Sequence, residues 1–235
     1  MSQVPFVEFP KIPRLKRDCV ITEKIDGSNA QIHITKGEHR IDALFDPSVV
    51  RFATLDGVEY ILRAGSRSRW ITPGKETDNF GFAAWVYDHG DELVALGEGS
   101  HFGEWYGAGI QRTYDLPDRR FALFNTARWN PDNPNKPACC EVVPVLYTGA
   151  MGDAEEVVEE LRQMGSVHVP GYKYPEGVVV YHTASRQLFK QLIENDDRPK
   201  TAANDPGERK PRDPNKGGRR VGLTPGYAGP ERRAA

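Results

Sequence analysis

The chain has 235 residues, of which 38% are hydrophobic and 27% charged, a composition typical of a globular protein. No apolar run reaches the length of a membrane span, and the N-terminus lacks the basic and apolar regions of a secretory signal. We therefore expect a cytoplasmic protein with no membrane partner. The three cysteines, Cys19, Cys139 and Cys140, have the spacing of neither a disulfide framework nor a zinc site.

The net charge of −2 hides an uneven distribution of charged residues. Residues 198–235 contain ten Lys and Arg against four Asp and Glu, which leaves 21 against 29 for residues 1–197. This tail has almost no bulky apolar residue, so it cannot bury enough surface to offset the entropy of ordering. We expect one folded domain in residues 1–197 and a disordered tail in residues 198–235. The tail either adds non-specific affinity for nucleic acid or is solvated without a role.

The N-terminal part of the chain predicts a lead-in followed by two strands. The prolines in residues 1–17 favour extended backbone, and we expect this segment to pack on the domain surface. Apolar residues alternate with polar ones at residues 30–35 and also precede Lys24. Asp26-Gly27 lies between these two strands, which predicts a tight hairpin turn. Lys24 would then lie at a strand end, beside backbone amides that can approach a ligand closely, and its amine could reach a phosphate.

The later strand patterns predict the fold class. They lie at residues 58–63, 101–106, 120–125, 140–147, 177–181 and 187–193. The first of these ends near Arg67 and Arg69, a pair of cations that can hold an anion. Strands grouped in this way, without strict alternation of strand and helix, predict an α+β fold with antiparallel sheets.

Two segments have helical patterns. Residues 78–96 have apolar positions on one side, with Asp78 as the expected N-cap. Residues 153–164 form the clearest helix, because Asp153 and Glu156 have the spacing of a capping box that precedes an apolar stripe.

Two glutamates are candidate partners for Lys24. Glu104 follows a glycine inside a strand flanked by aromatic residues, and Glu176 precedes the glycine that opens an apolar strand. Carboxylates at strand ends can project into one site, and oxygen ligands of this kind suit a hard divalent cation that bridges to phosphates. Taken singly, each is more often an ordinary carboxylate at the edge of a sheet.

A further cation and two aromatic residues complete the candidates. Lys190, on the last strand, would favour the neutral, nucleophilic form of Lys24 and neutralise a reacting phosphate if the two lie close together. A lone lysine at a sheet edge more commonly extends its charged end into water. Phe121 and Phe124 offer flat faces for stacking a base, although aromatic residues on a strand more often belong to the core.

These pieces follow one another in an informative order. The order is Lys-x-Asp-Gly at Lys24, Ser-Arg at Arg67, Phe-Gly-Glu at Glu104, an aromatic strand, Glu-Gly-Val-Val at Glu176 and Phe-Lys at Lys190. In this order, over about residues 8–200, the chain resembles the covalent nucleotidyltransferase superfamily of polynucleotide ligases and mRNA capping enzymes. The order is far more specific than any single piece.

Asn29 makes the resemblance narrower. DNA ligases and capping enzymes usually carry Arg at this position, whereas the stretch Glu-Lys-x-x-Gly-Ser-Asn is similar to the motif of the RNA ligase branch. The resemblance implies a nucleotidyltransferase (ATP-grasp-like) domain of antiparallel sheets with flanking helices. Ligases and capping enzymes commonly add an OB-fold or helical domain, but the sequence leaves no room for one after residue 197, so we expect a catalytic domain with a basic tail and no second OB-fold domain.

The resemblance further implies a reaction and its catalytic residues. Lys24 would attack the α-phosphate of ATP, expel pyrophosphate and become lysyl-AMP. The AMP would pass to an RNA 5′-phosphate, and a 3′-hydroxyl would displace it to seal the strand. Glu104 and Glu176 would serve the ribose and a Mg²⁺ or Mn²⁺ ion, and Lys190 would bind the α-phosphate.

A second set of residues would bind the nucleotide. These residues are Glu23, Ile25, Asn29, Arg67, Phe121 and Phe124. By resemblance, the first two would edge the adenine pocket, and one of the two phenylalanines would stack on adenine. Asn29 and Arg67 would contact the nucleotide or the RNA 5′-phosphate.

The chain also departs from the family pattern. Leu188 stands where the last motif usually has its first Lys, and Asn125 stands where Asp is common. The favoured interpretation is an ATP-dependent RNA ligase that acts in RNA repair on nicked duplexes or RNA ends. A small DNA ligase, a generic adenylyltransferase and a nucleic-acid-binding relative with weakened chemistry remain as alternatives.

Overall fold

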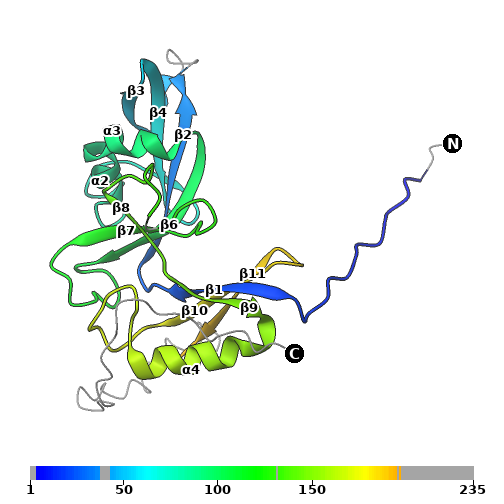
Figure 1. Ribbon diagram of the computed structural model, residues 1–235. Coiled ribbons are helices and arrows are strands. Elements are labelled where there is room, and N and C mark those ends of the chain that lie inside the picture. The colour runs from blue at the N-terminus through cyan, green and yellow to red at the C-terminus, as the bar shows by residue number, and fades with distance from the viewer. Residues whose placement is uncertain (1–3, 38–42, 131, 195, 197–235) are drawn as a thin grey trace.

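Two β-sheets set at an angle to each other form the framework of the protein (Figure 1). A computed structural model describes residues 4–37, 43–130, 132–194 and 196. The strands are β1 (Asp18–Lys24), β2 (Ser28–Lys36), β3 (Val49–Leu55), β4 (Val58–Gly65), β5 (Trp70–Ile71), β6 (Gly99–Gly107), β7 (Arg119–Leu123), β8 (Cys140–Val142), β9 (Val145–Ala150), β10 (Gly177–His182) and β11 (Gln187–Leu192). The helices are α2 (Phe82–Asp88), α3 (Gly90–Leu93) and α4 (Ala154–Met164), with 3₁₀ turns η2 (Val94–Leu96) and η3 (Met151–Asp153).

The strand pairings confirm the expected α+β class. The larger sheet has the order β3-β4-β2-β6-β7-β8, with β5 beside β4, and the smaller sheet has the order β11-β10-β1-β9. The described pairings are antiparallel, except that β7 and β8 run parallel.

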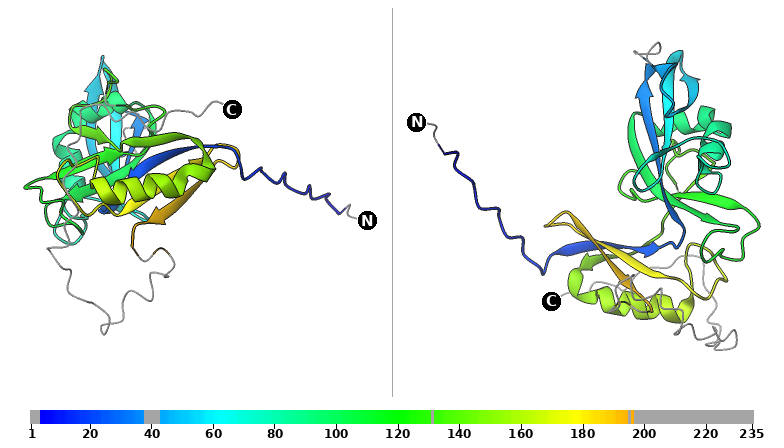
Figure 2. Two further views of the ribbon diagram at one scale, coloured as in Figure 1. Left: turned by 60° about the horizontal axis from the view of Figure 1, so that its bottom comes forward. Right: turned by 180° about the vertical axis from the view of Figure 1, so that it is seen from behind.

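Helices cover the large sheet on one face only, because its strands alternate in polarity. Along β2, Ala30, Ile32 and Ile34 are buried in the main core, whereas the intervening polar side chains are partly exposed. Helices α2 and α3 pack on the apolar face, on the side away from the small sheet (Figure 2). The helical region predicted at residues 78–96 is confirmed from Phe82 onward. Gly81 rather than Asp78 is the N-cap residue, although the Asp78 carboxylate accepts hydrogen bonds from the Ala83 and Ala84 amides at 2.8 and 3.0 Å.

The small sheet packs on α4 in the same one-sided way. Ile21 of β1 and Val178 of β10 are buried with Val157 and Leu161 of α4 in a second core. The predicted helix at residues 153–164 is confirmed within one residue. The predicted capping box is not confirmed. The carboxylate of Asp153 accepts a hydrogen bond from the Tyr147 hydroxyl and makes no capping bond to the described helix.

The expected hairpin at Asp26-Gly27 is wrong, because the two strands beside it belong to different sheets. β1 pairs with β9 and β10, whereas β2 pairs with β4 and β6. The chain therefore crosses from the small sheet to the large one at these two residues. A Cβ on Gly27 would lie 2.4 Å from the Trp105 carbonyl oxygen and 2.8 Å from the Tyr106 Cβ. Only glycine allows the backbone to approach β6 this closely.

A second crossing runs beside the first. The single strand expected at residues 140–147 is instead β8 in the large sheet and β9 in the small sheet, joined at Val143 and Pro144. The Val143 amide donates to the Leu123 carbonyl at 3.1 Å, and the Glu23 amide donates to the Pro144 carbonyl at 3.2 Å. The first bond holds this connection to β7, and the second joins it to β1 just before Lys24.

The N-terminal lead-in does not pack on the domain as expected. Phe6, Phe9 and Ile12 are 91%, 78% and 81% exposed, and the segment extends away from both sheets (Figure 1). The tail predicted to be disordered, residues 198–235, lies outside the described residues. None of the described helices is long and apolar enough to cross a membrane.

The crossing predicts a specific cost for Gly27→Ala. The added methyl group would contact the backbone of β6, so we expect the free energy of unfolding to fall by about 1–3 kcal/mol, the usual cost of overpacking. Gly152→Ala is the matched control, because its Cβ would meet nothing within 4 Å. Urea denaturation measures both variants, and equal stability of the two would contradict this account of the crossing.

Candidate functional site

Lys24 lies where the small sheet ends and the chain crosses to the large one. It is the last residue of β1 and is paired with Gly177, the first residue of β10. Glu176 immediately precedes that glycine, and its Oε2 accepts a hydrogen bond from Lys24 Nζ in an ion pair. The two side chains are 22% and 14% exposed, so the pair is largely shielded from water.

Glu104 reaches the same place from the large sheet. It lies on β6 opposite Asn29, and its Oε1 accepts a hydrogen bond from the Gly27 amide at 3.1 Å. The pKa of Glu104 is raised to about 7, chiefly by burial; the charge of Lys24 and the Gly27 hydrogen bond lower the pKa, and the charge of Glu176 adds to the rise. These interactions place the predicted lysine and both predicted glutamates in one electrostatically coupled group.

Two residues that the sequence analysis did not identify hold the crossing in place. The hydroxyl of Tyr114, a fully buried residue, accepts a hydrogen bond from the Asp26 amide at 2.7 Å. Arg112 Nε donates to Asp26 Oδ2 at 2.9 Å, and its Nη1 donates to the Tyr174 carbonyl at 2.9 Å. Tyr114 has a positive φ of 54°, a conformation that nonglycine residues seldom adopt. No periodic pattern in the sequence pointed to this loop.

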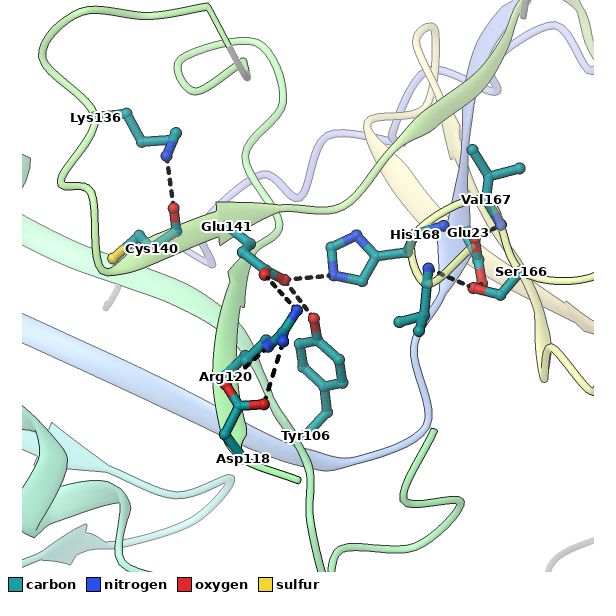
Figure 3. A network of polar contacts seen from close by, with 11 residues as sticks. Glu23, Tyr106, Asp118, Arg120, Lys136, Cys140, Glu141, Ser166, Val167 and His168 are labelled. Atoms are coloured by element: carbon teal, nitrogen blue, oxygen red, sulfur yellow. Dashed lines mark hydrogen bonds and ion pairs between the residues drawn. The ribbon is translucent and has the colours of Figure 1, made fainter. Parts of the chain in front are cut away.

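Glu23 points away from Lys24, because neighbouring residues on a strand face opposite sides. Its side chain is buried, and both oxygens are occupied (Figure 3). Oε1 accepts from the Ser166 hydroxyl at 2.5 Å, and Oε2 accepts from the Val167 and His168 amides at 2.8 Å each. Burial raises the pKa of Glu23, and these hydrogen bonds oppose the rise. The side chain therefore anchors a loop and has both oxygens occupied, and the place of Glu23 at the edge of an adenine pocket stays a prediction.

The anchored loop continues into a polar network on the large sheet (Figure 3). His168 Nε2 lies 3.0 Å from Glu141 Oε2, and the Tyr106 hydroxyl donates to the same oxygen. Arg120 Nη1 lies 3.3 Å from the other oxygen. Burial favours a raised pKa for Glu141, but the bonds from His168 and Tyr106 and the charge of Arg120 bring it below its usual value. The segment around Lys24 is thereby connected to both sheets.

The two candidate phenylalanines lie on opposite faces of the large sheet. Phe121 is fully buried in the main core, where its ring centroid lies 5.2 Å from that of Phe82. It therefore has no free face for a base, which corrects its assignment as a cofactor-binding candidate. Phe124 is 38% exposed on the same face as Glu104. Ile25 is buried among Tyr106, Ala122 and other residues between the sheets.

The remaining candidates lie around the ion pair without contacting it. Lys190 is exposed on β11, opposite Val179, and the pairing register places it on the same face of the small sheet as Lys24. Arg67 is exposed in the turn between β4 and β5, where the Ser66 amide donates to the Arg69 carbonyl at 2.8 Å. Within the described residues, the structure thus brings Lys24, Glu104 and Glu176 together. Lys190 and Arg67 lie on the exposed surface of β11 and of the turn between β4 and β5.

This arrangement is suited to chemistry on a phosphate. The open, partly polar faces of both sheets face the inside of the angle between them, and the helices lie outside it (Figure 2). Lys24 provides an amine whose proton Glu176 can accept, and the two carboxylates provide the hard oxygen ligands that a divalent cation requires. A second group of possible ligands, His89, Glu92 and Cys139, lies away from this site on the helical side.

Comparison with known proteins gives one clear match to a family. A family model described as RNA ligase matches residues 17–195. No curated protein sequence matches the chain. Among solved structures, Naegleria gruberi RNA ligase with PPi is 18% identical, with a TM-score of 0.48 over 77% of this chain and 52% of that chain. A point mutant of this ligase with ATP and Mn is 18% identical, with a TM-score of 0.47 over 74% and 49%. The chain thus spans about half the length of these structures.

The raised pKa of Glu104 predicts a particular dependence of stability on pH. A glutamate protonated more readily in the folded state stabilises that state fully below its unfolded pKa of 4.5, and the effect is lost as pH rises through about 7. We expect wild-type protein to lose on the order of 3 kcal/mol relative to Glu104→Gln across this window. Urea denaturation at several pH values measures the free energy of unfolding of both proteins. Parallel dependence on pH in the two would contradict a raised pKa for Glu104.

Proposed function

This chain belongs to the RNA ligase family, and from its site geometry we propose that it is an ATP-dependent RNA ligase that works through a covalent lysyl-AMP on Lys24. The observation that carries the proposal is the position of the Lys24 amine. It lies at the crossing between two open sheet faces, bonded to Glu176 and electrostatically coupled to Glu104. Family membership supports a ligase reaction for this group, and the geometry supports the role proposed for each residue.

The first step transfers an adenylyl group to the protein. Lys24 Nζ gives up a proton, for which Glu176 is the nearest acceptor, and its lone pair attacks the α-phosphorus of ATP. A phosphorus–nitrogen bond forms, and the bond to pyrophosphate breaks. The reaction requires positioning and neutralisation of charge more than covalent work by other protein groups. Lys190, on the same face as Lys24, would neutralise the α-phosphate.

The large sheet would hold the nucleoside. Glu104 and Asn29 are opposite each other on β6 and β2, so both can face a ribose or phosphate placed next to Lys24. Of the two candidate phenylalanines, Phe124 is the one exposed on this face, and it would stack on adenine. Arg67 would contact a phosphate from the rim of the sheet.

The carboxylates also fit a divalent cation. Glu104 and Glu176 provide oxygen ligands from two sheets, and Mg²⁺ and Mn²⁺ both accept such ligands. Such an ion, when bound, would neutralise phosphate charge. The pKa of Glu104 near 7 means that cation binding at this carboxylate would compete with a proton and strengthen as pH rises.

In the later steps, the adenylyl group moves to RNA. An oxygen of an RNA 5′-phosphate attacks the phosphorus of lysyl-AMP, which releases Lys24 and forms adenylylated RNA. A 3′-hydroxyl then attacks the RNA phosphate, forms the phosphodiester and releases AMP. Leu188 occupies the position of a usual lysine and is 69% exposed, so one phosphate-binding charge is absent from this position.

The second candidate function is a small DNA ligase or a general adenylyltransferase, which would use the same first step. Asn29, in place of the arginine usual in DNA ligases, favours RNA. A binding protein without chemistry is less well supported, because the Lys24–Glu176 pair is intact.

Labelling with ATP tests the first step. Incubation with ATP labelled at the α-phosphate and Mg²⁺ or Mn²⁺ should leave label on the denatured protein, and Lys24→Ala should abolish it. Glu176→Gln should slow labelling by about 10²- to 10⁴-fold, the usual contribution of acid–base catalysis. Lys75→Ala is the matched control, because this lysine is exposed in a loop and should label normally. Labelling by GTP but not ATP would instead indicate a capping-type enzyme.

Strand preference tests the later steps. Wild-type protein should seal a nicked RNA duplex faster than a nicked DNA duplex of the same sequence, as gel analysis of the products would show. Faster sealing of DNA would support the DNA ligase alternative. Adenylylated RNA that accumulates without sealing would restrict the activity to adenylyl transfer.

A further inference from the structure

A row of residues crosses the open face of the large sheet from β5 to the end of β7. Trp70 of β5 is opposite Gly65 of β4, Gly65 is opposite Gln31 of β2, and Gln31 is opposite Phe102 of β6. The Phe124 amide, just beyond β7, donates to the Phe102 carbonyl at 3.0 Å and extends the row. Because residues directly opposite each other point to the same face, the three aromatic side chains share one surface.

The aromatic residues of this row are exposed, although the sheet has a large core on its other face. Trp70, Phe102 and Phe124 are 43%, 50% and 38% exposed. Gly65 and Gln31 separate Trp70 from the neighbouring rings of Phe102 and Phe124, so the three do not form the continuous apolar patch typical of a protein-docking surface. Separate aromatic rings on a polar sheet are instead the arrangement on which successive bases stack.

Trp70 is held in position by its neighbours. A Cβ on Gly65 would lie 3.3 Å from two atoms of the indole ring, so the ring rests on the bare backbone of that residue. Its centroid is 5.7 Å from that of His33, with the planes at 44°. A side chain larger than glycine at position 65 would displace the ring, which indicates a fixed platform.

The row lies next to the proposed reaction site, and a pair of cations flanks its Trp70 end. Asn29 and Glu104 form the next row along the same face, two residues nearer the crossing at Lys24. Arg67 and Arg69 are exposed in the turn that joins Gly65 to Trp70, and because β4 and β2 are antiparallel, this turn leaves the row on the same side as Asn29 and Glu104. A nucleic acid strand that reaches the site across this face would pass aromatic rings and positive charge together.

We propose that Trp70 and Phe102 form a stacking platform for unpaired bases of an RNA end, whose phosphates pass Arg67 and Arg69. This inference rests on the proposed function for the identity of the strand. The platform requires a single strand, because the faces of paired bases within a duplex are stacked on each other. Trp70 and Phe102 are three strand spacings apart, about 14 Å, and this distance would accommodate a short run of nucleotides.

Fluorescence anisotropy with a short, labelled, 5′-phosphorylated single-stranded RNA, in the absence of ATP, tests the platform. Trp70→Ala and Phe102→Ala should each weaken binding by about 5- to 100-fold, the range for loss of one stacked base. A blunt RNA duplex should compete poorly with wild-type binding. Tyr87→Ala is the control, because Tyr87 is 51% exposed on α2, on the opposite face of the sheet, and its loss should leave affinity unchanged.

Three results would overturn the platform: single-strand affinity unchanged in both variants, equal loss in Tyr87→Ala, or equally strong competition by the duplex. Loss of ATP binding without loss of RNA binding in Phe102→Ala would instead assign that ring to the nucleotide pocket. Because the assay needs no ATP, its failure is distinct from that of the proposed function. RNA binding with this mutational pattern but without labelling of Lys24 would refute only the ligase chemistry.

Discussion

The contact between Lys24 and Glu176 is the interaction on which the arrangement of the site depends. It follows from the register of β1 and β10, which pairs Lys24 with Gly177 and so places the preceding glutamate beside the amine. A shift of one residue in that register would turn the lysine to the helical side of the sheet. The antiparallel pairing therefore fixes which face carries the chemistry, before any ligand is considered.

The strand that carries Lys24 is also fixed on its other side. Glu23 is buried and receives three hydrogen bonds, so removing any donor would leave part of a buried acid unsatisfied, at a cost of about 1–3 kcal/mol. Through His168, the anchored loop contacts Glu141 of the large sheet. Because side chains alternate between the two faces of β1, Glu23 helps to hold the sheets together and Lys24 faces the site.

The sequence was sufficient to predict the class of fold, most strands and the acidic partners of Lys24, because alternation and strand ends are local properties. It was not sufficient to predict that Asp26-Gly27 joins two sheets, since a local turn pattern does not specify the partner of either strand. The same limit applies to Phe121 and Phe124: alternation along the strand puts them on opposite faces, but which of these faces the helices cover depends on the packing of the sheet. Tyr114 lies in an irregular loop and was visible only in three dimensions.

The most direct measurement of the central claim is mass spectrometry of the protein after incubation with ATP and a divalent cation, followed by proteolysis. The account predicts one adenylyl group on the peptide that contains Lys24, attached through the side-chain nitrogen, and its removal when pyrophosphate is added. An adenylyl group on Lys190 or any other residue instead, or none on a folded protein that binds ATP, would contradict it.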